Sequence, residues 1–381
     1  MINYKRRILI ACDSSHTLLG FRGKLIAELA KTNQVHIFTP KILDADNLQT
    51  LKDLKVIVHE NELMGSNVSI LSDLRYIQNL YRLMRQIKPD IFFPYTFKPV
   101  IYGTLIAKIC KVKRITPMLT GLGYNFSDQV KGLNIISKIT RILLKISLIH
   151  DQSLSLIFQN KDDYSKLLAG KIISLKHSTT IVNGSGVDLS HYDFSLPDNK
   201  NISFLMIARL INAKGIQEYH EASRLVKLDF PNARFTLIGP YDNNIDSISN
   251  ALYQKIKSGE VIEYLGQVRD VRPFIKKASI IVLPSYYGEG VPRCLLEGMA
   301  IGRPIITCDS VGCRETVVTV PHKQNGFLIP VKNSPALAIT MAYYLNNKTE
   351  IITQGVNGRA YAQEKFDVNL VNAEMLRVMY A

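Results

Sequence analysis

Glu289 and Glu297 flank the expected start of a helix. A glycine-bearing loop precedes that helix, and Pro292 stands where a first helical residue belongs, since the nitrogen there needs no helical partner. The backbone amides of Val291 and of the residues from Arg293 onward then lie at a helix N-terminus, which attracts anions. A carboxylate, a row of amides and a second carboxylate suit a ligand with hydroxyl groups on both sides of a diphosphate, such as a nucleotide sugar. The plain alternative is a capped helix with two solvated glutamates.

Two cations follow another apolar run. Arg209 and Lys214 stand just after residues 203–208, at the start of a helical pattern, where ligand crevices open in α/β sheets. A fork-shaped guanidinium and a compact ammonium can together grip a diphosphate. They can also neutralise a departing phosphate without a metal ion. Two ordinary surface cations at a helix start are the simpler alternative.

These residues need a scaffold, and the sequence indicates one. Short apolar runs alternate with helical patterns along the whole chain, which is typical of parallel sheets covered on both faces. We therefore expect an α/β fold of two facing doubly wound Rossmann-like domains with a cleft between them. The expected strands are 7–12, 35–39, 56–59, 91–94, 114–119, 156–159, 180–182, 203–208, 234–238, 261–264, 280–283, 304–306 and 326–329. The expected helices lie near 17–31, 69–87, 98–110, 133–150, 161–169, 214–228, 245–258, 270–277, 292–301, 335–346 and 350–365.

The length of 381 residues is enough for two domains, because single cores stop growing near roughly 250–300 residues. The polar stretch 188–201 has the composition of a linker. We expect an N-terminal domain over 1–187 and a C-terminal domain over 188–365. A final helix over 366–381 is expected to return to the first domain.

Positive charge is concentrated in the first half. Residues 1–190 hold 26 lysines and arginines against 14 acidic residues, whereas the rest hold 21 against 18. A strongly basic half attracts an anionic partner such as a phosphorylated ligand, an acidic membrane or a nucleic acid. No apolar run reaches the roughly 18 residues that span a bilayer, and five scattered cysteines favour free thiols in a reducing compartment. The sequence thus indicates a soluble or peripheral protein.

Three motifs lie at 208–215, at Glu289-x7-Glu297 and at 302–306, and they are supported by 183–188 and 265–268. Together they resemble glycosyltransferase family 4, whose members are retaining enzymes with two Rossmann-like domains of the GT-B type. The resemblance covers nearly the whole chain and is strongest from about 200 to 330. It implies a nucleotide-diphospho-sugar donor of the UDP-linked kind, bound by the C-terminal domain, and an acceptor bound by the N-terminal domain.

The N-terminal half resembles a narrower bacterial subgroup through residues 96–103 and 119–124. Members of that subgroup extend undecaprenyl-diphosphate-linked sugars in O-antigen, capsule and protein-linked glycans, several of them adding N-acetylgalactosamine or galactose in α linkage. The resemblance thus implies a polyprenyl-diphosphate glycan acceptor at the inner face of the cytoplasmic membrane. One departure is that the N-domain loop 120–123 lacks the family's histidine, for which His16 is the nearest substitute.

The resemblance also implies roles for individual residues. Glu297 holds the ribose hydroxyls and Glu289 contacts the hydroxyls of the transferred sugar. Arg209 and Lys214 grip the diphosphate and stabilise its departing charge, so that these two cations and Glu289 form the catalytic set. Donor contacts also come from Gly20, Gln267, Val268, Gly290, Val291 and Arg293, and the acceptor-side candidates are His16, Arg22 and Lys98.

No cofactor or metal ion is expected. Asp44 and Asp46 form a DxD pattern, which ligates a divalent metal in the other common glycosyltransferase fold, but chance explains it better in an early polar loop. The first strand is not followed by GxGxxG, which disfavours a nicotinamide dehydrogenase. Two alternatives stay open: a sugar-nucleotide epimerase or hydrolase on the same architecture, and a basic nucleic-acid-binding protein. The second lacks any readable recognition motif, so no nucleic-acid partner is expected.

The segment 131–151 predicts a basic amphipathic helix. Lys131, Lys138, Arg141 and Lys145 fall on one side of it, and isoleucines and leucines occupy the neighbouring face. One interpretation is a helix lying against anionic lipid near the acceptor. The other is an ordinary surface helix whose apolar face belongs to the core.

Overall fold

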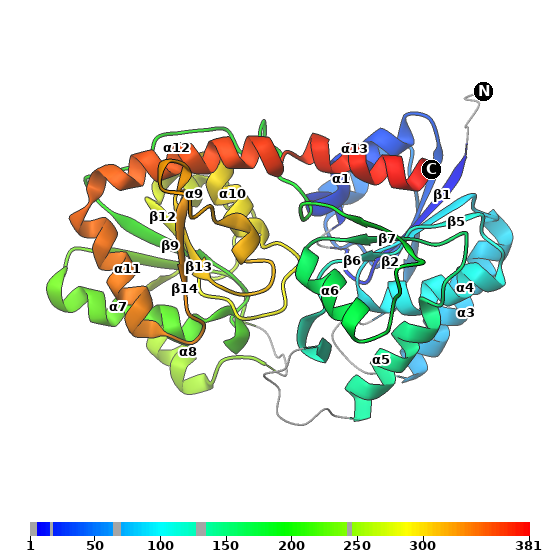
Figure 1. The fold of residues 1–381 in the computed structure, drawn as a ribbon, viewed down its shortest axis with the longest axis horizontal. Coiled ribbons are helices and arrows are strands. Elements are labelled where there is room, and N and C mark those ends of the chain that lie inside the picture. The colour runs from blue at the N-terminus through cyan, green and yellow to red at the C-terminus, as the bar shows by residue number, and fades with distance from the viewer. Residues whose placement is uncertain (1–5, 16–17, 64–69, 127–134, 242–245) are drawn as a thin grey trace. The chain divides into compact units, whose positions relative to one another are not determined.

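The chain divides into two compact units, seen in the computed structural model of Figure 1. The structure describes residues 6–15, 18–63, 70–126, 135–241 and 246–381. Unit 1 comprises Met1–Ser185 and Val371–Ala381, and unit 2 comprises Gly186–Leu370. The expected boundary at 187/188 differs from this division by two residues. Within the described residues, no helix combines the length and the apolar character needed to cross a membrane.

Unit 1 is built on a five-stranded parallel sheet in the order β3-β2-β1-β4-β5. A second parallel sheet, β6-β7-β8, continues from it through single bridges that join Tyr95 to Met118 and Ile115 to Leu154. The strands are β1 (Arg7–Ala11), β2 (Gln34–Pro40), β3 (Ile57–Asn61), β4 (Ile91–Pro94), β5 (Arg114–Ile115), β6 (Met118–Leu119), β7 (Ser155–Phe158) and β8 (Ser178–Ile181). The helices are α1 (Leu18–Ala30), α2 (Ala45–Asp53), α3 (Ile70–Ile87), η1 (Pro99–Gly103), α4 (Thr104–Ile109), η2 (Gly123–Phe126), α5 (Ile135–Ser147), α6 (Lys161–Ala169) and most of α13 (Val368–Tyr380).

Unit 2 has one six-stranded parallel sheet in the order β11-β10-β9-β12-β13-β14. Counted along the unit, this is the order 3-2-1-4-5-6 of dinucleotide-binding folds. The strands are β9 (Ser203–Ile207), β10 (Arg234–Ile238), β11 (Glu263–Tyr264), β12 (Ile280–Leu283), β13 (Ile305–Cys308) and β14 (Gly326–Ile329). The helices are η3 (Asn212–Lys214), α7 (Ile216–Asp229), α8 (Asn250–Lys257), α9 (Arg272–Lys277), α10 (Arg293–Ile301), η4 (Arg314–Thr316), η5 (Pro321–Lys323), α11 (Ser334–Asn346) and α12 (Lys348–Lys365).

Both faces of the unit 1 sheet are buried, because successive side chains of a strand point to opposite sides. Leu9 and Ala11 of β1 join the core cluster that α3 and α4 cover, whereas Ile8 and Ile10 join the cluster that α1 and α13 cover. Met375 and Met379 of α13 belong to the second cluster. The expected α/β fold with two Rossmann-like domains is confirmed.

Two elements differ from the expected ones for local reasons. The single strand expected over 114–119 is divided into β5 and β6, and Pro117, which has no amide to donate, lies between them. The helix expected over 245–258 begins only at Asn250. The Ser249 side chain accepts the amide of Leu252 there and caps the helix.

The polar stretch 188–201 is anchored within unit 2. Arg303 is fully buried and donates to the carbonyl of Ser195 at 2.5 Å and to its hydroxyl at 2.8 Å. Arg359 donates to the carbonyl of Tyr192 at 3.0 Å. The interpretation of this stretch as a linker is therefore corrected. Its polar composition reflects hydrogen bonds to unit 2 rather than freedom of the chain.

Helix α5 carries an apolar face that the described residues of unit 1 leave exposed. Ile139, Ile142 and Ile146 are 50%, 58% and 45% exposed, while Leu144 is buried in the core of unit 1. These three isoleucines are therefore not part of a core face, whereas Leu143 of the same expected apolar face packs partly against the core of unit 1. Lys131 lies outside the described residues.

Candidate functional site

The segment that carries Lys214 and the segment that carries Glu289 lie beside each other in unit 2, because they follow neighbouring strands. Lys214 ends η3, in the connection after β9, and Glu289 lies in the loop after β12. β9 and β12 are paired in parallel, and the strand order reverses between them. Open α/β sheets bind ligands at this point, beyond the carboxyl ends of the strands.

A shared carbonyl fixes the two loops together. The carbonyl oxygen of Ala213 accepts the backbone amides of Tyr286 at 2.9 Å and Tyr287 at 3.1 Å, and the Ser285 hydroxyl at 3.2 Å. Gly215, which follows Lys214, has φ +77°, and a Cβ there would lie 2.3 Å from the carbonyl oxygen of Pro284. Only glycine allows this approach without displacing the backbone. Backbone contacts thus fix the position of Lys214 relative to the loop that carries Glu289.

Lys214 and Glu289 form a largely buried ion pair. The Lys214 ammonium donates to Oε1 of Glu289, and the Ser285 hydroxyl donates to the same oxygen at 3.2 Å. The Lys214 ammonium also lies 5.4 Å from the centre of the Tyr287 ring. Burial alone would lower the pKa of Lys214, but the attraction and the hydrogen bond of Glu289 outweigh it, so that the pKa is raised. Lys214 therefore stays protonated at neutral pH.

Glu297 on α10 is held through one of its two oxygens. Oε1 accepts the Tyr192 hydroxyl at 2.8 Å and the Arg293 guanidinium through Nε at 3.1 Å and Nη2 at 3.0 Å. The other oxygen, Oε2, has no hydrogen-bond partner among the residues that the structure describes. A carboxylate fixed in this way offers a ligand one oriented oxygen, which suits the paired hydroxyls of a ribose.

Sequence reasoning missed Tyr192 and gave Arg293 only a backbone role. The Arg293–Glu297 pair has the i, i+4 spacing of a helical ion pair, so that a signal for it was present. Tyr192 lies 105 residues from Glu297 in the sequence, and nothing local connects the two. Pro292, expected as the first helical residue, is the N-cap of α10.

Replacing Tyr192 with phenylalanine tests this arrangement. We expect the KM for the donor to rise roughly 5- to 10-fold with kcat nearly unchanged, because one of three bonds that orient Glu297 is lost. Steady-state kinetics provides the measurement. The matched control is Tyr344→Phe, since the Tyr344 hydroxyl is also buried in unit 2, where it donates to Gln354 at 2.5 Å. Equal KM values for both variants would contradict the role given to Tyr192.

The remaining donor-side candidates surround the same edge of unit 2 or belong to unit 1. Gly290 and Val291 are buried before α10, while Arg209 after β9 is exposed. The positive charge of Arg209 acts on the Tyr287 hydroxyl and opposes the rise that burial causes in its pKa. After β11, Gln267 is exposed and Val268 packs partly against the core.

Gly20 of unit 1 lies in the first turn of α1, which begins at Leu18. A Cβ added at Gly20 would meet no atom within 4 Å, so that space for a ligand exists above it. Its contact with a diphosphate stays a prediction.

The acceptor-side candidates of unit 1 have different surroundings. Arg22 is only 2% exposed, its Nη2 lies 3.0 Å from the sulfur of Met118, and its guanidinium carbon lies 5.6 Å from the centre of the Tyr95 ring. Lys98 donates to Asp73 at 2.8 Å in a largely buried pair. His16 lies outside the described residues.

A polar cluster that the sequence analysis did not single out lies at the carboxyl edge of the unit 1 sheet. Asp13 follows β1, Thr96 follows β4, and the two strands are paired. The amide of Asp13 donates to the Thr96 hydroxyl at 3.3 Å, and burial raises the pKa of the Asp13 carboxyl. Thr96 has φ +69°, a costly conformation for a β-branched residue. Both residues stand two positions after the end of a strand, and the two strands are adjacent in the sheet. This placement could have pointed to them in the sequence.

The first carboxylate of the DxD pattern has a structural role. Asp44 is the N-cap of α2, accepting the amides of Asp46 at 2.9 Å and Asn47 at 3.2 Å, so that the segment expected as a loop is the start of a helix. Among the described residues, no three histidine, cysteine, aspartate or glutamate side chains gather as a metal site would require. Activity without a metal ion stays a prediction.

Two family models match the chain, one in each unit. Residues 7–160 match the model described as glycosyl transferase 4-like, and residues 201–347 match the one described as glycosyl transferases group 1. Among curated proteins, an N,N'-diacetylbacillosaminyl-diphospho-undecaprenol α-1,3-N-acetylgalactosaminyltransferase of Campylobacter jejuni is 24% identical over 98% of both chains. A UDP-Gal:α-D-GlcNAc-diphosphoundecaprenol α-1,3-galactosyltransferase of Escherichia coli is 22% identical over 70% of this chain and 69% of its own length.

Solved structures share the fold of both units. The Anabaena protein HepE, crystallised with UDP-glucose, superposes with a TM-score of 0.76 at 16% identity over 98% of this chain and 99% of its own. The sucrose-phosphate synthase of Thermosynechococcus elongatus gives a TM-score of 0.78 at 17% identity over 98% of both chains. At these identities the likeness is one of fold.

Proposed function

The chain belongs to the glycosyltransferases, and from that premise we propose that it transfers a hexose in α linkage from a UDP-sugar to a polyprenyl-diphosphate-linked glycan. The hexose is N-acetylgalactosamine, galactose or a related sugar. The Campylobacter jejuni and Escherichia coli relatives carry the names of such transferases for undecaprenyl-diphosphate acceptors. The reaction belongs to the synthesis of a surface polysaccharide such as a capsule or an O-antigen.

One observation carries the proposal: the placement of Lys214, Glu289 and the Glu297 network around the strand switch of unit 2. Glu297 offers Oε2 to ribose hydroxyls, and the amides before α10 face the diphosphate. Glu289 meets the hydroxyls of the transferred sugar, and Lys214 meets the leaving phosphate with Arg209. These roles follow the order of groups along a UDP-sugar.

The chemistry we propose is front-face substitution with retention. The bond from the anomeric carbon to the leaving phosphate breaks, and the acceptor oxygen bonds to the same face of that carbon. The acceptor's proton passes to an oxygen of the departing phosphate, whose charge Lys214 and Arg209 stabilise. A carboxylate nucleophile, as retaining glycosidases use, is not required, because Glu289 and Glu297 are committed to substrate hydroxyls.

A transfer assay tests the proposed function. The purified protein is incubated with UDP-N-acetylgalactosamine or UDP-galactose and a panel of undecaprenyl-diphosphate glycans, in buffer with EDTA. We expect one acceptor to be extended, with an α-anomeric product by NMR. UDP-sugar turnover that is the same with and without every acceptor would instead support the epimerase or hydrolase alternative. A β-anomeric product, or activity lost in EDTA, would contradict the proposed mechanism.

The acceptor lipid brings the enzyme to the inner face of the cytoplasmic membrane, and we assign the contact to α5. Three exposed isoleucines lie beside Lys138 and Lys145, which are also exposed. Such a helix can bury its apolar side chains among the lipid headgroups while its cations meet anionic lipids. The guanidinium carbon of Arg141 lies 4.8 Å from the centre of the Phe126 ring, which ties the same helix to η2.

Neutralising two lysines of α5 tests this contact. The double variant Lys138→Gln/Lys145→Gln should bind anionic vesicles roughly 30-fold more weakly, because each cation near the surface contributes about 1 kcal/mol. Co-sedimentation with phosphatidylglycerol vesicles measures it. The matched control is Lys255→Gln/Lys257→Gln, two exposed lysines of α8 in unit 2. Unchanged binding of the α5 variant would remove this helix from the membrane contact.

A further inference from the structure

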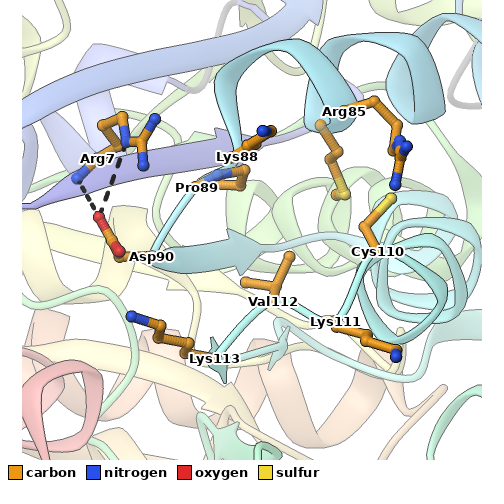
Figure 2. Close-up of a pocket in the computed structure, with 10 residues that line it drawn as sticks. Arg7, Arg85, Lys88, Pro89, Asp90, Cys110, Lys111, Val112 and Lys113 are labelled. Atoms are coloured by element: carbon orange, nitrogen blue, oxygen red, sulfur yellow. Dashed lines mark hydrogen bonds and ion pairs between the residues drawn. The ribbon is translucent and has the colours of Figure 1, made fainter.

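A group of basic residues lies at the amino edge of the unit 1 sheet. A cavity of about 260 Å³ opens at the amino ends of β1, β4 and β5, where the chain leaves α3 and α4 (Figure 2). The polar cluster of Asp13 and Thr96 lies at the carboxyl ends of the same strands. β4 has four residues, so that the two edges are separated by roughly 13 Å. The lining residues are Arg7, Met84, Arg85, Lys88, Pro89, Asp90, Cys110, Lys111, Val112 and Lys113.

The single carboxylate of the cavity is already bound. Asp90 accepts the backbone amide of Arg7 at 2.9 Å, and the Arg7 Nε lies 4.0 Å from the same oxygen. Arg7 also donates through Nη1 to the carbonyl of Ile87 at 2.8 Å. Figure 2 shows Arg7 and Asp90 facing each other on one side of the cavity. These contacts join the start of β1 to the end of α3 and make a fixed wall.

Four other cations surround the cavity without a carboxylate partner. Arg85, Lys88, Lys111 and Lys113 are exposed, and none of them pairs with an acidic side chain among the residues that the structure describes. The floor between them is apolar, with Met84, Pro89 and Val112 buried. An apolar floor beside several cations strengthens their attraction for an anion.

We propose that this cavity binds phosphoryl groups. A volume of about 260 Å³ is smaller than that of drug-sized ligand sites and suits a phosphate or a diphosphate. A guanidinium can bind phosphate oxygens in pairs, and three ammonium groups supply point charges around it. The site is separate from the donor site of unit 2 and does not depend on the proposed function.

The phosphoryl group can come from a membrane lipid or from a soluble phosphate ester. Ile109 precedes the lining residue Cys110 and is 69% exposed, which suits contact with the lipid headgroup region. The experiment must therefore separate the two sources with different probes.

Cys110 is a reporter inside the cavity, because it lines the cavity as a half-exposed free thiol. Its rate of alkylation by iodoacetamide, followed by peptide mass spectrometry in the full-length protein, is measured alone, with sodium pyrophosphate, and with phosphatidylcholine vesicles with or without phosphatidic acid. We expect pyrophosphate to slow the alkylation of Cys110. If vesicles with phosphatidic acid slow the alkylation of Cys110 more than vesicles of phosphatidylcholine alone, the site binds a lipid phosphate. If only pyrophosphate slows the alkylation, the site binds a soluble phosphate ester.

The variant Lys88→Asn/Lys111→Asn should weaken the protection roughly 10-fold in pyrophosphate concentration. Both lysines have positive φ, a conformation that asparagine tolerates. The matched control is Lys55→Asn/Lys171→Asn, since these two exposed lysines also have positive φ in unit 1 but lie outside the cavity. The proposal would be overturned if no phosphoryl probe protected Cys110 from alkylation, or if both double variants lost this protection equally. Unchanged protection in Lys88→Asn/Lys111→Asn would do the same.

Discussion

Replacing Lys214 with alanine is expected to lower kcat/KM by roughly 10²- to 10³-fold, with most of the loss in kcat. The ammonium is positioned by the Ala213 carbonyl and by Gly215, and its charge is maintained by Glu289. Its attraction to the phosphate grows as the sugar leaves, because negative charge collects on the phosphate oxygens. An interaction that strengthens in this way acts on kcat more than on binding.

Lys214→Ala removes a cation from the donor site, and it also leaves the Glu289 carboxylate without its ion-pair partner. A control must separate these two effects. Glu289→Gln keeps the shape of the side chain and removes its charge, and the double variant Lys214→Ala/Glu289→Gln completes a cycle. If the loss in Lys214→Ala comes from the missing cation, the double variant stays as slow as the single one. Recovery of kcat in the double variant would show that the unpaired carboxylate caused the loss. A rise in KM with unchanged kcat would contradict the role of Lys214 in the reaction step.

Replacing Arg303 with alanine is expected to lower the free energy of unfolding of unit 2 by roughly 3–5 kcal/mol. The Arg303 guanidinium is fully buried and donates to the carbonyls of Ile275 at 3.0 Å, Lys276 at 2.8 Å and Ser195 at 2.5 Å. Burial lowers the pKa of Arg303 to about 10, so that it stays charged at neutral pH. Its removal leaves several carbonyls without donors and releases the stretch that carries Tyr192.

Calorimetry of thermal unfolding measures this loss, since the chain has no tryptophan to report it by fluorescence. The matched control is Arg377→Ala. The Arg377 side chain is 66% exposed and pairs with Glu374 on the surface, where such a pair contributes at most about 1 kcal/mol. Similar shifts in the two variants would contradict the structural role of Arg303. Because Arg303 also anchors the segment of Tyr192, the KM for the donor should rise in the variant that still folds.

Much of the fold and part of the site could be predicted, because the signals were local. Apolar runs of four or five residues placed β4, β10, β12 and β14 at their observed bounds. Glu289 and Glu297 were found together because a loop and the helix after it carry both. Lys214 and Arg209 were found because they follow a strand.

What could not be predicted depends on contacts between distant residues. Tyr192 meets Glu297 across 105 residues, and Arg303 meets Ser195 across 108. The helical period placed α5 correctly, but the period alone does not say which side packs, and its exposed isoleucines became evident only in the structure. The cavity beside Arg85 and Lys113 likewise combines loops that have no shared motif.

If unit 2 holds the donor through Glu297, UDP must bind through that carboxylate, and a calorimetric titration of UDP measures this. The wild-type protein and Glu297→Ala are titrated in the same buffer with EDTA. We expect one UDP site in the wild type and at least roughly 10-fold weaker binding in the variant, because the ribose hydroxyls lose their carboxylate. Absence of UDP binding to the wild type, or equal affinity of the two proteins, would contradict it.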